Sequence, residues 1–98
     1  MMRDFIFLMH NDATTALSPE MWEPCLTTLQ ARGIFDGGSA IGAGEAFRKQ
    51  ASPGPVNDHL GGYIPVRAES LAAARDYLAG NPVYECGGTV EIRELPRD

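Results

Sequence analysis

The order of its periodic segments places this chain in the α+β class, as a ferredoxin-like βαββαβ sandwich with two helices on one face of a four-stranded antiparallel sheet. Three observations predict this class. An apolar strand pattern opens the chain, two stretches have helical spacing, and glycine and proline stop signals separate them from further strand patterns. The expected strands lie near 4–10, 34–42, 61–67 and 88–95, and the expected helices near 18–32 and 70–79. The length of 98 residues suits a single domain, 1–98.

The first strand is apolar on both of its faces. Residues 5–9 form a continuous apolar run, which is typical of a strand covered on both sides. Because helices can cover only one face of such a sheet, we expect the other face to be buried in a homodimer, with Phe7 and Tyr63 at the interface. His10 and Asp12 follow at the strand end, where they could line a cleft. A capped strand that leads into a loop is the simpler interpretation.

A helix start is encoded at Ser18-Pro19-Glu20, because serine caps, proline fits the first helical position and an acidic residue suits the positive helix end. The spacing predicts one buried face, formed by Trp22, Cys25, Leu26 and Leu29. Pro24 predicts a kink or a 3₁₀ first turn. We interpret Cys25 as a small core residue, whereas Trp22 could lie under the core or face the cleft.

The middle of the chain is weakly patterned. Two glycines, Gly37 and Gly38, loosen the strand expected at 34–42. Residues 42–60 follow without a sustained period, and a connection of this length is usually functional or mobile. It supplies Asp58 and His59 as candidate site residues. A solvated hairpin arm is the simpler interpretation.

The second half repeats the strand, helix and strand order. Tyr63 should point away from the core, and Pro65 predicts a local bulge because proline cannot complete a hydrogen-bond ladder. The helix at 70–79 should end at Gly80-Asn81-Pro82 and be followed by a turn-rich link at 83–88. The residues expected in the core are Leu71, Ala74, Leu78, Val90 and Ile92.

Composition excludes several classes of function. The net charge is −5 and no run of like charges exceeds two residues, so a basic nucleic-acid-binding face is missing. The two cysteines, Cys25 and Cys86, lack metal-ligand spacing and predict no disulfide. The apolar run at 5–9 is too short for a signal segment or membrane span. We therefore expect a cytoplasmic protein that has no metal or other cofactor and contacts neither nucleic acid nor membrane.

Seven short motifs occur in a characteristic order. They are Phe-Ile-Phe-Leu-Met at 5–9, Leu-Ser-Pro-Glu-Met at 17–21, Gly-Ile-Phe-Asp-Gly-Gly at 33–38, Leu-Gly-Gly-Tyr at 60–63, Ser-Leu-Ala-Ala-Ala at 70–74, Asn-Pro-Val-Tyr at 81–84 and Val-Glu-Ile-Arg-Glu-Leu at 90–95. Together they resemble the YCII-related (YciI-like, DGPF) family over nearly the whole chain. The resemblance implies a dimeric α/β barrel, in which two sheets pack face to face and each protomer keeps a pocket between its sheet and its helix-loop elements.

Members of the YciI branch carry a histidine on the first helix that faces an aspartate at the end of the first strand, proposed as an acid–base dyad. Asp12 could match that aspartate, while the histidine position falls near Trp22. The DGPF sequence of the other branch is missing from 42–60. The resemblance therefore implies the architecture more directly than it implies a reaction.

One functional hypothesis is an enzyme of small-molecule chemistry, such as a lyase or isomerase acting without a cofactor on an aromatic or similar metabolite. His10 or His59 would transfer protons, because the imidazole pKa lies near neutrality, and Asp12 or Asp58 would assist. By fold analogy alone, cofactor-free monooxygenases and muconolactone-isomerase-like enzymes are the alternative.

A second hypothesis is a non-catalytic ligand-binding or regulatory dimer, and a third is a purely structural dimer. The binding hypothesis uses a pocket lined by Met9, Trp22 and Tyr63, with Asp58 nearby, since it needs only a concave apolar site with a few polar anchors. For either site hypothesis, we expect convergence on one cleft at the end of the first strand by His10, Asp12, Trp22, His59 and Tyr63.

Overall fold

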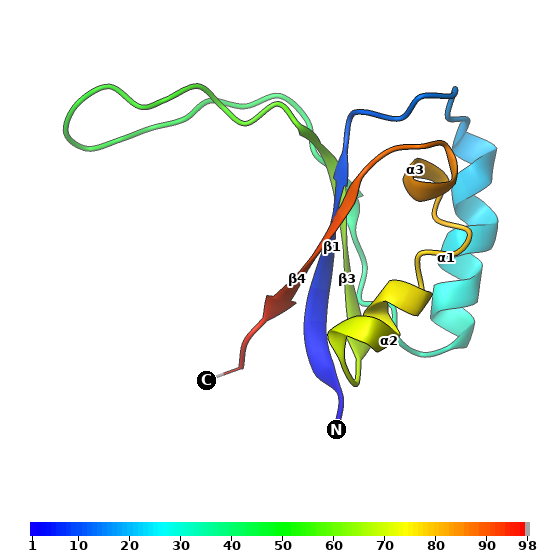
Figure 1. Ribbon diagram of the computed structural model, residues 1–98. Helices are drawn as coiled ribbons and strands as arrows, with labels where there is room; N and C mark the ends of the chain where they lie inside the picture. The colour runs from blue at the N-terminus through cyan, green and yellow to red at the C-terminus, as the bar shows by residue number, and fades with distance from the viewer. Residues whose placement is uncertain (98) are drawn as a thin grey trace.

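A four-stranded antiparallel sheet forms one layer of the structure, and helices form the other (Figure 1). The computed structural model describes residues 1–97. The strands are β1 (Arg3–His10), β2 (Ser39–Ala40), β3 (Leu60–Ala68) and β4 (Val90–Leu95), in the spatial order β2-β3-β1-β4. This α+β arrangement fits a ferredoxin-like layout, which confirms the predicted class at that level.

The helical layer covers a single face of the sheet (Figure 1). A 3₁₀ turn at Pro19–Met21 leads into α1 (Trp22–Ala31), followed later by α2 (Leu71–Asp76) and α3 (Pro82–Glu85). The predicted 3₁₀ opening is thus confirmed. Pro24 is the third residue of α1, where its missing N–H costs no helical hydrogen bond.

The short helix α3 corrects the prediction of a turn-rich link at 83–88. The Asn81 side chain accepts a hydrogen bond of 3.1 Å from the Tyr84 backbone N–H, and Pro82 occupies the first helical position. Both are strong helix-start signals. Asn81-Pro82 therefore begins a new helix as well as marking the end of the preceding helical region, and α2 itself stops at Asp76.

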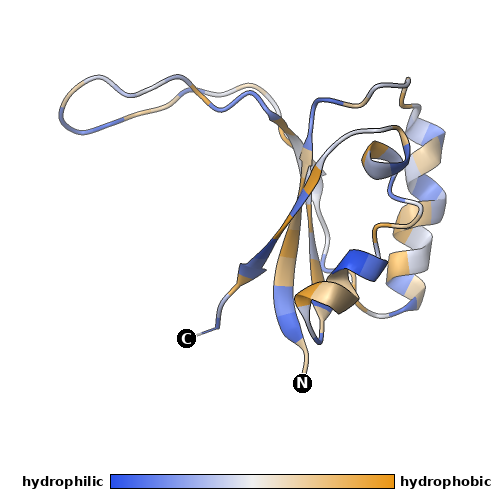
Figure 2. Cartoon of the chain, viewed as in Figure 1, coloured by the Kyte–Doolittle hydropathy of each residue, from blue (hydrophilic) through white to orange (hydrophobic). Residues whose placement is uncertain are grey.

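The core lies between the helices and the face of the sheet that carries Phe5, Phe7 and Met9. Figure 2 shows apolar residues both in the strands of the sheet and in the helices beside it. Ile64 and Val66 of β3 extend this apolar surface. Phe7 is 0% exposed, so our expectation that it lies at a dimer interface is wrong. Both faces of β1 are apolar, and the helices cover the face that includes Phe7.

The helical contribution to the core is mostly as predicted. Cys25 and Leu29 of α1 are buried, as are Ala74 and Leu78 in and after α2. Leu71 is the exception: it is 54% exposed, because it is the first residue of α2 and does not face the sheet. Two further predicted core residues, Val90 and Ile92, are half-buried against the same cluster.

The second strand is much shorter than the predicted 34–42. Beyond β2, only an isolated bridge joins Phe35 to Val66. Gly37 and Gly38 between these points adopt φ values of 95° and 147°, which interrupt an extended strand. A Cβ atom on Gly38 would lie 2.5 Å from the Tyr63 carbonyl oxygen, so this close approach also requires glycine.

The bulge predicted at Pro65 is wrong, because Pro65 pairs with Ile6 in regular register. Its carbonyl accepts a hydrogen bond of 3.1 Å from the Asp36 N–H, on the side of the interrupted second strand. The N–H and C=O of a strand residue point to the same side. The backbone nitrogen of Pro65, which has no hydrogen to donate, therefore faces the segment that contains Asp36, where the hydrogen-bond ladder is already interrupted. The register shift occurs instead between Met9 and His10.

An arm formed by residues 41–59 extends away from both layers (Figure 1). All its side chains except Ala46 are exposed, and Phe47 is 84% exposed. The radius of gyration of 14.9 Å exceeds the ~13 Å typical of a compact domain of this length, in keeping with the extended arm. Within residues 1–97, no helix is both long and apolar enough to cross a membrane.

Candidate functional site

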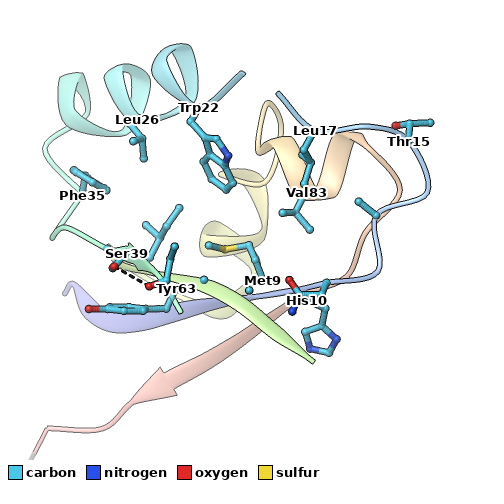
Figure 3. Close-up of a pocket in the computed structure, with 17 residues that line it drawn as sticks. Met9, His10, Thr15, Leu17, Trp22, Leu26, Phe35, Ser39, Tyr63 and Val83 are labelled. Carbon is cyan, nitrogen blue, oxygen red and sulfur yellow. Dashed lines mark hydrogen bonds between the residues drawn. The ribbon is translucent and has the colours of Figure 1, made fainter. Parts of the chain in front are cut away.

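A cavity of about 670 Å³ lies between α1 and the sheet, at the end where β1 stops (Figure 3). Apolar side chains from both layers form its walls: Met9, Leu17, Trp22, Leu26, Phe35, Ile64 and Val83. The volume falls within the ~300–1,000 Å³ typical of small-molecule sites. Trp22 and Leu26 remain half-buried beside it, because the helix layer does not close over the sheet here.

The polar side chains around the cavity carry no formal charge. Asn11, Thr15 and Ser39 contribute to its lining, and none of the lining residues is Asp, Glu, Lys or Arg. The Thr15 hydroxyl donates to the Cys86 carbonyl at 3.3 Å, and the Ser39 hydroxyl donates to the Ala40 carbonyl at 2.8 Å. Both hydroxyl hydrogens therefore already form hydrogen bonds within the protein.

Two glycines at the start of β3 keep the floor of the cavity open. A Cβ atom on Gly62 would lie 3.1 Å from the Ser39 carbonyl oxygen and 3.4 Å from the Met9 methyl carbon. A Cβ atom on Gly61 would collide with the Asn11 side chain. A larger residue at either position would displace the Ser39 carbonyl or the Asn11 side chain and reduce the open space of the site.

The structure divides the predicted site residues between the two faces of the sheet. Met9 and Trp22 face each other across the cavity (Figure 3). Tyr63 is paired with Leu8, and its ring projects from the opposite, open face. His10 borders the cavity through its position at the strand end, but its imidazole also projects away (Figure 3). Three of the five residues expected in one cleft, His10, Trp22 and Tyr63, therefore border the cavity, but only Trp22 turns its side chain into it, and Asp12 and His59 do not line it.

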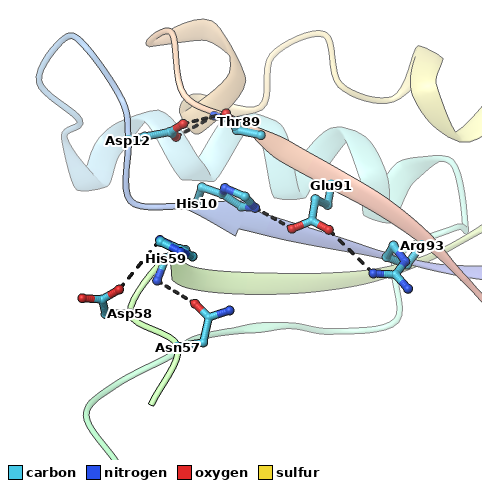
Figure 4. A network of polar contacts seen from close by, with 8 residues as sticks. All are labelled: His10, Asp12, Asn57, Asp58, His59, Thr89, Glu91 and Arg93. Atoms are coloured by element: carbon cyan, nitrogen blue, oxygen red, sulfur yellow. Dashed lines mark hydrogen bonds and ion pairs between the residues drawn. The ribbon is translucent and has the colours of Figure 1, made fainter. Parts of the chain in front are cut away.

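A polar network surrounds His10 on the open side (Figure 4). Its Nε2 lies 2.6 Å from Oε2 of Glu91, and Oε1 of Glu91 lies 3.7 Å from an Arg93 guanidinium nitrogen. The His59 ring stacks nearby, with a centroid distance of 6.4 Å and an interplanar angle of 20°. Sequence reasoning missed Glu91; the only available signal was its alternation with Val90 and Ile92, which directs it away from the core.

Asp12, the predicted partner of a catalytic histidine, is engaged elsewhere. It accepts hydrogen bonds from the Thr89 backbone N–H at 2.7 Å and from the Thr89 hydroxyl at 2.6 Å (Figure 4). The Thr89 hydroxyl and then its N–H lower the pKa of the Asp12 carboxyl. Asp12 therefore ties the loop after β1 to the start of β4.

Asp58 and His59 lie at the exit of the arm. His59 Nδ1 is 3.7 Å from an Asp58 carboxylate oxygen, with side chains 75% and 94% exposed respectively. The His59 backbone N–H donates to the Asn57 side chain at 2.7 Å. At such exposure, an ion pair contributes little rigidity, so this pair does not form a preorganised site in the protomer.

The cysteines offer no alternative chemistry. Both are free and buried, and burial raises the pKa of the Cys25 thiol, which disfavours the nucleophilic thiolate. This agrees with the prediction that Cys25 is a core residue. Among residues 1–97, no cluster of three His, Cys, Asp or Glu side chains is arranged to hold a metal ion.

Comparisons with known proteins add no assignment. No protein-family model matches the chain, and no curated protein matches its sequence.

Proposed function

We propose that this protein binds a small molecule in the cavity between α1 and the sheet. The observation that supports this function is the cavity itself: about 670 Å³, with apolar walls and a few uncharged polar groups at its margin. Ligand sites have this composition, because apolar contact supplies affinity and a few polar groups fix orientation. A chain of 98 residues buries only a small core, so apolar side chains that line an open cavity are lost to that core. This cost favours a role for the cavity in ligand binding.

We further propose that the protein is a homodimer that packs through the open face of the sheet, as in the dimeric α/β barrel of the YCII-related family. The support is an apolar strip of half-buried side chains on that face: Ile6, Leu8, Tyr63 and Pro65. Ion pairs border this strip, including Arg97–Asp4 at 2.6 Å and Arg67–Asp36 at 3.2 Å. An apolar centre with a charged margin is typical of protein interfaces.

The binding function can be tested by thermal shift against a library of small metabolites. A compound that binds the cavity should raise the melting temperature and change the fluorescence of Trp22, the only tryptophan. Ala40 pairs with Gly62 on the helix-facing side of the sheet and lines the cavity, so Ala40→Phe should remove both effects. Ala43→Phe is the matched control, because Ala43 is exposed and outside the cavity.

The binding function fails if the compounds that raise the melting temperature leave Trp22 fluorescence unchanged and act equally on wild type and Ala40→Phe. Such compounds would bind elsewhere. It also fails if no compound in a broad library raises the melting temperature of the wild type.

A second candidate function is acid–base catalysis of the lyase or isomerase type, which the 2.6 Å contact between His10 and Glu91 favours. If the carboxylate accepts the Nε2 hydrogen, Nδ1 of neutral His10 is left as a base, the arrangement used by many catalytic histidines. Because the His10 imidazole lies on the open face, the substrate of this reaction would bind there and not in the cavity, and the proton exchange of such a compound with solvent can be followed by NMR. Catalysis requires exchange that His10→Gln abolishes; equal exchange in both proteins would exclude His10 as the base.

A further inference from the structure

We infer that the ligand of the cavity is an uncharged molecule with a flat apolar body and a hydrogen-bond acceptor that pairs with the Trp22 indole N–H. This inference rests on the proposed binding function, and it specifies the chemical class of ligand. It follows from the charge, the shape and the free donors of the cavity lining.

The absence of charge follows from the side chains that surround the cavity. Among its lining residues, no carboxylate, ammonium or guanidinium group occurs, and the imidazole of His10 points to the other face, where it contacts Glu91 (Figures 3 and 4). A charged ligand group would therefore lose water without gaining an ionic partner. The desolvation of an unpaired ion costs several kcal/mol, which selects against both anions and cations.

The flat shape follows from the two side chains that face each other across the site. Trp22 projects from α1 toward Met9 on the sheet (Figure 3). A planar ring can stack against the indole while its edge contacts the thioether, and both contacts are favourable for aromatic groups. Leu26 of α1 and Phe35, which bridges to Val66 of β3, extend the apolar wall.

The acceptor follows from the hydrogen-bond inventory of the lining. The Asn11 amide donates one of its two hydrogens to the Asp58 backbone carbonyl at 3.1 Å, and the hydroxyls of Thr15 and Ser39 donate to backbone carbonyls. By contrast, no residue lining the cavity accepts a hydrogen bond from the indole N–H of Trp22 (Figure 3). An indole N–H usually pairs when it is removed from water, so a bound ligand should supply the acceptor.

Four small probes of similar size separate these requirements. Acetophenone is neutral and carries a carbonyl acceptor, ethylbenzene is neutral without an acceptor, benzoate is anionic, and 1-phenylethylammonium is cationic. Titration into isotopically labelled protein can be followed at the single indole N–H signal, which belongs to Trp22, and at the Met9 and Leu26 methyl signals. Acetophenone should bind at least about tenfold more tightly than either ion, which corresponds to about 1.4 kcal/mol of unrecovered desolvation.

The indole signal tests the hydrogen bond. Acetophenone should move it downfield by more than ethylbenzene does, although both probes should perturb the two methyl signals. In Trp22→Phe, acetophenone affinity should fall about fivefold, the effect of one net hydrogen bond, and ethylbenzene affinity should change less. Ethylbenzene thus controls for the smaller ring and for any local repacking in the variant.

Each outcome has a distinct meaning. Binding of benzoate or 1-phenylethylammonium as tight as that of acetophenone, with Met9 and Leu26 shifts, would overturn the inference of an uncharged ligand while leaving the binding function intact. Equal losses of acetophenone and ethylbenzene affinity in Trp22→Phe would overturn the assigned acceptor. If none of the probes perturbs the Met9 and Leu26 signals up to the solubility limit of each probe, both the inference and the proposed cavity function are contradicted.

Discussion

The imidazole Nε2 of His10 lies 2.6 Å from the carboxylate Oε2 of Glu91, across the β1–β4 pair and on the face of the sheet opposite the cavity. The two side chains are 23% and 40% exposed, so solvent reaches both. The contact joins a residue at the end of one strand to a residue near the start of another, 81 positions away in the sequence.

This contact predicts the tautomer of His10. With Glu91 as acceptor, neutral His10 should carry its hydrogen on Nε2, because a carboxylate holds the ring nitrogen that donates to it. Nitrogen NMR shifts of the imidazole report the tautomer directly. Glu91→Gln should return His10 toward a mixture of tautomers, whereas Glu94→Gln, which removes the partner of Arg3, should not. The same tautomer ratio in all three proteins would show that the contact does not persist in solution.

Asp12 predicts an acid-dependent stability. Its folded-state pKa lies below the ordinary value of 3.8, because Thr89 donates hydrogen bonds to the ionised form. The stabilisation is therefore fully present above pH 3.8 and is lost as pH falls through the folded-state pKa.

Asp12→Asn should accordingly lower the urea midpoint at pH 7, and the difference from wild type should shrink below pH 3.8. Asp58→Asn is the control, since the Asp58 side chain is 94% exposed, and should behave as wild type. A difference between Asp12→Asn and wild type that persists undiminished into strong acid would contradict the assigned linkage.

The apolar open face of the sheet predicts a homodimer that a single substitution should dissociate. Leu8→Lys should convert the dimer to monomer in sedimentation equilibrium, because the dimer would bury an ammonium group in its apolar centre. Glu91 lies directly opposite Leu8, so the lysine has a partner in the monomer and the fold should persist. Leu71→Lys changes an exposed leucine on α2 and should remain dimeric. A monomeric wild type at micromolar concentration would refute the dimer.

The backbone conformation at position 38 favours glycine, so replacing Gly38 should lower the stability of the protein. Gly38→Ala should destabilise the protein by about 1–3 kcal/mol, because the residue has a φ of 147° and its Cβ would lie 2.5 Å from the Tyr63 carbonyl oxygen. Gly42→Ala is the matched control: an added Cβ meets no heavy atom within 4 Å, and its stability should be unchanged or slightly higher. Urea unfolding of both variants measures the contrast, and equal stabilities would show that the backbone at 38 relaxes freely.

The architecture was predictable because its signals are local. Helical spacing placed Cys25 and Leu29 in the core, and strand alternation directed Tyr63 away from it. The assignment of Phe7 failed because both faces of β1 are apolar, and periodicity cannot tell which face the helices cover. The two glycines predicted a weakened second strand but not how many of its residues leave the sheet. That number depends on the close approach of Gly38 to the backbone of β3, which the sequence does not reveal.

The site was less predictable because it depends on register and packing. Met9 and Trp22 were identified from their places at a strand end and a helix start, and both line the cavity. His10 and Tyr63 were grouped with them by proximity in the topology, but their side chains point to the other face (Figure 3). Glu91 could be connected to His10 only once the pairing of β1 with β4 was known.

The most direct test of the cavity as the binding site is a measurement of intermolecular nuclear Overhauser effects between a bound compound and the methyl groups of the protein. Acetophenone, or any compound found by thermal shift, should show contacts to the Met9 and Leu26 methyls, because these flank the cavity. The methyls of Ile6 and Leu8 lie on the opposite face and should show none. Contacts confined to Ile6 and Leu8, with none to Met9 or Leu26, would contradict the account and place the ligand on the open face of the sheet.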